Sequence, residues 1–190
     1  GGHYEMAVPF KSDKIHLPDN YDMASKRLIS LKRRLQKDPQ FHDKYSHEMS
    51  KLVQKVYAEK VPIKELSRND GRVWYIPHHG VYHPRKPDKL RVVFDCTSEF
   101  NNTSLNKNVF QGPDLTNNLI GVLIRFREHP IALMADIEAM FHQVKVRPDD
   151  HDALRFLWYE DGNITSQPVV YRMTSHLFGG VWSPSCASYA

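Results

Sequence analysis

The 190-residue chain lacks the features that define several classes of protein. Its two cysteines, Cys96 and Cys186, are too few for a disulfide framework or a cysteine metal site, which favours a reducing compartment. No apolar run approaches the roughly 18 residues that cross a membrane, and the N-terminus lacks the pattern of a signal peptide. We also find no glycine-rich phosphate loop, no nucleophile elbow and no histidine spacing typical of a metal site. We therefore expect neither a secreted disulfide scaffold nor a membrane protein.

The composition is that of an ordinary globular protein. Hydrophobic residues make up 41% and charged residues 25% of the chain, which is long enough for one domain or two small ones. The net charge is +4 and the sequence pI is about 9.0. This mild excess of positive charge fits an anionic partner, nucleic acid first, and equally fits a basic surface without a partner.

The first third of the chain predicts an antiparallel pair of helices. Apolar residues recur at helical spacing over 22–37, with Asp22 as a candidate N-cap, and again over about 40–59; the connection between them is short. The outer face of the first helix is basic, which fits either a nucleic-acid contact or a solvated surface. The two apolar stripes are Ala24, Leu28, Leu31 and Leu35, then Phe41, Tyr45, Met49, Leu52 and Val56.

The middle of the chain predicts a β-hairpin and a helix. Residues 72–84 and 90–95 are rich in aromatic and β-branched residues, and the basic stretch 85–89 between them contains turn residues. Residues 115–128 predict a helix with a cap at Thr116 or Asn117. Its apolar stripe is Leu119, Val122, Leu123 and Phe126.

The last third predicts strands, then the start of a helix. We expect a strand at 131–136, a turn or short helix through 137–143, and a hairpin formed by 153–163 and 169–173. Ser183 as the N-cap and Pro184 as the first helical residue predict a helix start that the chain follows for only a few residues, so we expect the sequence to be cut within an element. Because helices and strands do not alternate strictly, the pattern favours an α+β fold.

Asp136 ends the apolar run at 131–136, and two roles fit it. It caps the following turn, or it binds a metal ion, because a carboxylate at the end of a buried strand is held rigidly. One carboxylate is not enough for a two-metal site. Glu138, Asp149, Asp150 and Asp152 are near in sequence, but the last three lie in the polar stretch PDDHD, which reads as a solvated turn.

Phe141 and the basic hairpin also have two readings each. Phe141 is either a core residue or the floor under a bound sugar ring. Arg85, Lys86 and Lys89 near the hairpin tip are commonly solubilising, whereas Arg91 begins an apolar strand and so sits on a fixed element. A guanidinium held in this way binds phosphate oxygens with two hydrogen bonds.

Four blocks of sequence occur in a fixed order: LRVVFDCTSEFNNTSLN, QGPDLTNNLIGVLIRFR, ALMADIEAMFHQVKV and YRMTSHLFGGVWSPSCASYA. They resemble the reverse transcriptase of BEL/Pao-type long-terminal-repeat retrotransposons, and the resemblance extends over nearly the whole chain. It implies a right-hand polymerase fold. The expected parts are an N-terminal extension with the helical pair (1–60), a fingers-like hairpin and helix (61–130) and a partial palm (131–190).

The resemblance also implies roles for two residues around the first palm motif. Asp136 corresponds to the aspartate that binds the catalytic Mg²⁺, with Mn²⁺ as the alternative ion. Phe141 is similar to the aromatic steric gate, which lies under the deoxyribose and clashes with a 2′-hydroxyl.

Five further residues correspond to positions that contact the incoming nucleotide. Arg91 matches the fingers arginine that contacts the triphosphate, and Lys86 or Arg85 would assist it. Phe178 and Gly179 lie in a segment similar to the loop that lines the nucleotide pocket.

The resemblance therefore implies part of an RNA-directed DNA polymerase that takes dNTPs and an RNA or DNA template-primer. The family's Tyr-x-Asp-Asp motif would follow the last helix, so we expect these 190 residues alone not to polymerise. Exposed sheet edge would favour self-association. The expected location is a cytoplasmic retrotransposon particle, or else the nucleus. The alternatives are a retained nucleic-acid or protein binding module without catalysis, and a structural fragment without a partner.

Overall fold

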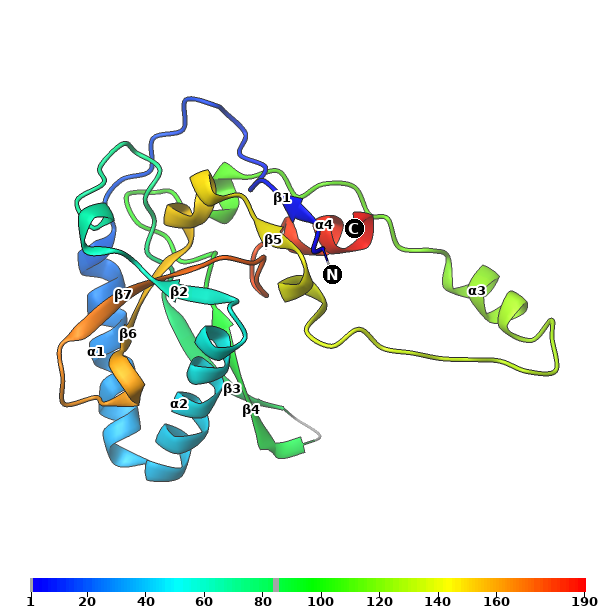
Figure 1. Cartoon of the computed structure of the whole chain (residues 1–190), viewed down its shortest axis with the longest axis horizontal. Coiled ribbons are helices and arrows are strands. Elements are labelled where there is room, and N and C mark those ends of the chain that lie inside the picture. Colours follow the sequence, from blue (N-terminus) through cyan, green and yellow to red (C-terminus); the bar gives the residue numbers. More distant parts are fainter. Residues whose placement is uncertain (1, 84–85) are drawn as a thin grey trace.

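Helices pack on small, mostly antiparallel sheets in the computed structural model of the chain (Figure 1), which confirms the α+β class. The structure describes residues 2–83 and 86–190; for residues 86–87 it describes the backbone alone. Across these ranges, no helix has both the length and the apolar character needed to cross a bilayer.

The predicted helical pair is present. α1 (Tyr21–Lys37) and α2 (Pro39–Gln54) run in opposite directions from a one-residue connection at Asp38, whose carboxylate accepts a hydrogen bond from the Phe41 backbone N–H at 3.0 Å and caps α2. The residue at the N-cap of α1 is Asn20 rather than Asp22. The predicted stripes face the core, except that Leu52 is half-buried and Val56 is exposed.

α2 ends earlier than the predicted residue 59 because the chain that follows joins a sheet. β2 (Ala58–Lys60) pairs with β7 (Pro168–Met173), and β7 pairs on its other side with β6 (Arg155–Tyr159); both pairings are antiparallel. The predicted hairpin of 153–163 with 169–173 is thereby confirmed, with the short 3₁₀ turn Glu160–Gly162 between its strands.

A second hairpin lies beside α2. β3 (His78–His83) and β4 (Lys86–Phe94) pair antiparallel, and this pairing confirms the predicted hairpin. The register is irregular between Tyr82 and His83. Arg85, a predicted triphosphate contact, lies outside the described residues. The rest of the predicted turn, 86–89, belongs to β4.

Shorter elements complete the structure. β1 (Glu5–Met6) pairs in parallel with β5 (Lys145–Val146), and a 3₁₀ turn, η3 (Met140–Gln143), precedes β5. Two further 3₁₀ turns span Ile63–Glu65 and Asn106–Asn108. α4 (Ser183–Tyr189) starts with Trp182 at its N-cap, so the prediction of Ser183 as the cap was wrong by one position.

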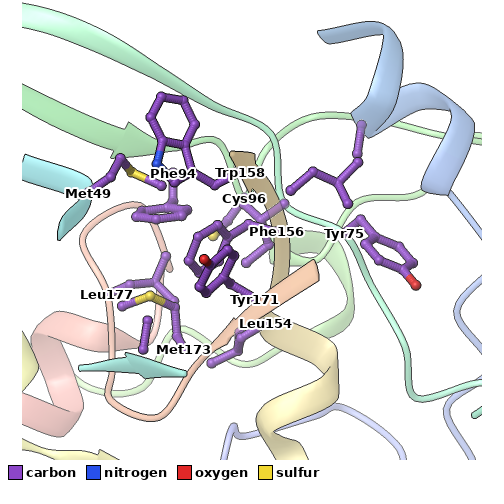
Figure 2. Close-up of a cluster of buried hydrophobic side chains, with 14 of the residues drawn as sticks. Met49, Tyr75, Phe94, Cys96, Leu154, Phe156, Trp158, Tyr171, Met173 and Leu177 are labelled. Atoms are coloured by element: carbon purple, nitrogen blue, oxygen red, sulfur yellow. The ribbon is translucent and has the colours of Figure 1, made fainter. Parts of the chain in front are cut away.

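Aromatic residues from both hairpins meet in the core (Figure 2). The Phe156 ring of β6 stacks on Tyr171 of β7, with centroids 5.7 Å apart, and meets the edge of the Phe94 ring of β4 at 5.1 Å. Trp74 is fully buried and belongs to the same hydrophobic cluster. This shared cluster fixes β4 relative to the three-stranded sheet.

The PDDHD stretch is a buried ion-pair site rather than the predicted solvated turn. It forms the 3₁₀ segment Pro148–Leu154, in which the Asp152 carboxylate accepts hydrogen bonds from Arg155 and Arg68 at 2.9 Å and from Arg172 at 3.1 Å. Burial alone raises the pKa of Asp152, but these three guanidinium groups outweigh it and lower the pKa. The Asp150 carboxylate is also buried and accepts a hydrogen bond from the Val8 backbone at 3.0 Å.

Residues 111–138, called the arm below, project from the rest of the described chain, called the body (Figure 1). The arm contacts the body near both of its ends, where Gly112 lies beside Ser185 and Glu138 pairs with Lys55. The arm contains α3 (Leu119–Phe126), capped by Asn118 rather than by Thr116 or Asn117. The expected apolar stripe of this helix is exposed to solvent.

The predicted strand at 131–136 is wrong, because this segment has no regular structure. Leu133 is 90% and Met134 is 91% exposed. A strand needs a neighbouring strand to bond its backbone, and none of the described segments lies beside this one in a sheet. Asp136 therefore does not lie at the end of a β-strand, although it follows an apolar run.

Candidate functional site

A cavity of about 360 Å³ lies between β4, α2, the 3₁₀ turn η3 and the loop before α4. It gathers residues that are far apart in the sequence, since its walls come from the first helical pair, the β3–β4 hairpin and the last third of the chain. Its lining comprises Glu48, Leu52, Arg91, Val92, Val93, Phe94, Ala139, Met140, Phe141, His142 and Phe178.

Arg91 supplies the positive charge of this cavity. It is paired with Val81 across the hairpin, so the sheet fixes its backbone, and its side chain is exposed to solvent. The one acidic side chain in the lining, Glu48, accepts a hydrogen bond from Lys51 at 2.6 Å. Arg91 therefore remains available to an anion that enters the cavity.

A left-handed residue turns the chain toward the cavity. Ala139 has φ +52° and ψ +43°, a conformation that costs energy for a residue with a Cβ, and η3 begins directly after it. This turn places Phe141 half-buried in the lining, with its ring centroid 5.9 Å from that of Phe178. Two aromatic rings from separate segments thus meet at one wall.

His142 anchors η3 through contacts with Tyr57 and with the backbone of His176. Its ring stacks on Tyr57 at 4.7 Å, and its Nδ1 lies 2.8 Å from the His176 backbone oxygen. Burial lowers the pKa of His142 and so favours its neutral ring, although the bond to the His176 oxygen acts in the opposite direction. The anchoring fixes the backbone of the adjacent Phe141.

The loop at Phe178 depends on a glycine. Gly179 has φ +117°, and a Cβ at this position would lie 2.1 Å from the backbone oxygen of Phe94, closer than atoms approach without a clash. Asn106 holds the loop from the other side, donating to the Gly179 oxygen and accepting from the Val181 N–H, both at 3.1 Å. No sequence signal separated Asn106 from the other asparagines of its polar stretch.

Asp136 does not line the cavity. It is exposed on the arm, and its neighbour Glu138 accepts a hydrogen bond at 2.6 Å from Lys55, the residue directly after α2. Among the residues placed by the structure, no group of three or more His, Cys, Asp or Glu side chains is arranged to hold a metal ion. Because Mg²⁺ takes several oxygen ligands in a near-octahedral arrangement, these residues as arranged do not fit it, and the metal role of Asp136 stays a prediction.

The other predicted nucleotide contacts have different outcomes. Arg91, Phe141 and Phe178 line one cavity, and Gly179 shapes its loop. Lys86 belongs to β4, but its side chain is outside the described part of the structure, as is all of Arg85. Chemically, the arrangement is a hollow with aromatic walls and a cationic edge, which suits a ring-bearing molecule with an anionic tail.

Comparison with known proteins finds a likeness among solved structures but none among families or curated proteins. No protein-family model matches the chain, and no curated protein matches it. Among solved structures, it is similar to a foamy viral protease–reverse transcriptase in complex with double-stranded DNA, with 15% identity and a TM-score of 0.47. The match covers 95% of this chain and 24% of that one, so the chain spans about a quarter of the viral protein. A TM-score below 0.5 does not establish the fold or the function of this chain.

Proposed function

We propose that the chain is part of an RNA-directed DNA polymerase of the BEL/Pao retrotransposon type, and that the cavity binds the incoming dNTP. One observation carries the proposal. Arg91, Phe141 and Phe178, which the sequence motifs assign separately to nucleotide contacts, line the same cavity although they come from three different segments.

Each of these residues has a distinct task in the proposed complex. The Arg91 guanidinium binds phosphate oxygens at the open side of the cavity. The rings of Phe141 and Phe178 contact the sugar and the base, since aromatic faces pack well on both. Gly179 and Asn106 act as positioning residues that fix the backbone of the Phe178 loop next to β4.

For these 190 residues the proposal covers nucleotide binding and not phosphoryl transfer. The carboxylates near Asp136 are either exposed or committed to other partners, so the arrangement does not support a metal-dependent step. We expect the purified chain to show no primer extension on an RNA or DNA template.

Equilibrium binding of a fluorescent dATP analogue tests the proposal. We expect Arg91→Gln to weaken binding by about tenfold or more, because a charge-assisted hydrogen bond contributes roughly 1.5–3 kcal/mol. Arg125→Gln, which removes an exposed arginine of α3, is the matched control and should bind like the parent chain. Equal affinity of the parent and the Arg91 variant would contradict the proposal.

A second comparison tests the sugar contact. We expect the parent chain to prefer dATP over ATP, and Phe141→Ala to reduce this preference, because the ring no longer occupies the space of a 2′-hydroxyl. A preference that the variant keeps in full would remove Phe141 from the sugar site.

A binding module without catalysis is the second candidate function. It is favoured by the absence of a grouped carboxylate site across residues 2–83 and 86–190. Nucleic-acid binding without measurable dATP binding would support the module over the polymerase fragment.

A further inference from the structure

α1 carries a straight row of exposed cations on its outer face, called the Lys26 row below: Lys26, Arg33 and Lys37. They are separated by seven and four residues. At about 100° per residue, this spacing keeps all three within a sector of about 40°, and at 1.5 Å per residue the row is about 16 Å long.

The surroundings of the row are strongly positive. α1 holds six lysines and arginines and one acidic residue, Asp22 in its first turn, so this helix alone carries +6 and −1 against a net charge of +4 for the whole chain. Three of the six have contacts: Arg27 pairs with Asp95 at 3.4 Å, while Arg34 and Lys32 lie over aromatic rings. No described acidic side chain lies within ion-pair distance of a member of the Lys26 row.

The opposite face of α1 limits the kind of partner. Its apolar residues are buried in the core of the body, between 1% and 8% exposed, so this helix cannot insert them into a lipid surface. They are Ala24, Leu28, Leu31 and Leu35. Attraction to a repeating negative charge is the interaction that the exposed face offers.

We infer that the Lys26 row binds the phosphodiester backbone of a nucleic acid, at a surface separate from the dNTP cavity. One strand of a duplex carries a phosphate about every 3.4 Å along the axis, so the row faces about five phosphates. With no aromatic or amide group on this stripe to contact bases, the binding does not select sequence. The inference adds a template-primer surface to the proposed function. The identification of the nucleic acid as template-primer rests on that proposed function.

The salt dependence of DNA binding tests this surface. We compare the parent chain with the variant K26Q/R33Q/K37Q, in which glutamine keeps the helix propensity and removes three charges. By anisotropy with a short labelled DNA duplex, we expect the slope of log K against log salt to fall in magnitude by about 2–3, since each neutralised phosphate contributes about 0.9. At low salt we expect a loss of about tenfold or more in affinity.

A variant of equal net charge serves as control. K14Q/K64Q/R147Q removes three exposed cations from three separate segments, and we expect it to keep the parent slope within about one unit. Equal slopes for the two triple variants would overturn the inference. It would also be overturned if the Lys26 row variant lost binding to vesicles of phosphatidylcholine and phosphatidylserine while keeping DNA binding.

Binding of the dATP analogue separates this inference from the proposed function. The Lys26 row variant should bind dATP like the parent chain, because the row is not part of the cavity lining. If the parent binds DNA through the row but does not bind dATP, the proposed function fails and the surface stands. If dATP binds and the two triple variants bind DNA alike, the surface fails and the proposed function stands.

Discussion

The body and the arm both contain apolar segments, but the segment of the body is buried and that of the arm is exposed. In β6, the five residues Arg155–Tyr159 are all buried; in the arm, the apolar residues of 131–136 are almost fully exposed. β6 has β7 on one side, and α1 packs against it. The comparison shows that an apolar sequence does not by itself make a segment buried. Burial also requires neighbouring elements that cover the segment.

The same contrast applies to acidic residues. Asp152 lies in the body with three guanidinium groups around it, whereas Glu138 lies on the arm in an exposed pair with Lys55. We therefore expect substitutions in the body to cost stability and matched substitutions in the arm to be nearly silent.

The largest expected effect is that of Asp152→Asn. It leaves Arg155, which is fully buried, without its ionic partner, so we expect a loss of about 3–5 kcal/mol in the free energy of unfolding. Urea denaturation measures it. Glu138→Gln is the matched arm variant and should leave the unfolding midpoint within error. Similar midpoints for both variants would break the comparison.

The next effect comes from apolar side chains. Leu157→Ala opens a space in the core and should cost about 2–5 kcal/mol, because Leu157 is 2% exposed. Leu133→Ala removes a side chain that is 90% exposed and should change stability by less than about 0.5 kcal/mol. If Leu133→Ala costs as much as Leu157→Ala, the arm is packed against something in solution.

Acid should weaken the body through His78. Burial lowers the pKa of His78 to about 4 from its ordinary value of 6.5, so the unfolded chain takes up the proton first. The contribution of neutral His78 to the free energy of unfolding is complete above pH 6.5. It is lost as the pH falls from 6.5 through 4, by roughly 3 kcal/mol at most. Urea denaturation at several pH values measures it. His78→Asn should make the curve less steep, and His176, whose pKa burial also lowers to about 4, should supply the slope that remains. An unchanged slope in that variant would exclude His78 as the cause.

Local pattern predicted much of the body. The stripes of α1 and α2 and both hairpins followed from spacing and composition, because each of these elements finds its partner nearby in the sequence or on the sheet. The predicted end of α2 was wrong because the strand β2 begins at Ala58 and takes residues that the pattern had assigned to the helix.

The parts that depend on distant partners were not predictable. Asp150 and Asp152 were predicted to be solvated because the Val8 backbone, Arg68 and Arg172, which bind them, lie at least 20 residues away in the sequence. For the candidate site, motifs named Arg91, Phe141 and Phe178, but only the structure showed that Glu48 and Leu52 of α2 share the same cavity. The expected strand under Asp136 failed for the same reason, since sequence does not state which strand would pair with it.

Photo-crosslinking with an azido-dATP, followed by peptide mapping, tests the central claim most directly. The claim is that one cavity formed by β4, η3 and the Phe178 loop receives a nucleotide. We expect crosslinks on peptides that contain residues 91–94, 139–142 or 178, competed by unlabelled dATP and reduced in Arg91→Gln. Competed crosslinks confined to the arm or to the outer face of α1 would contradict the account.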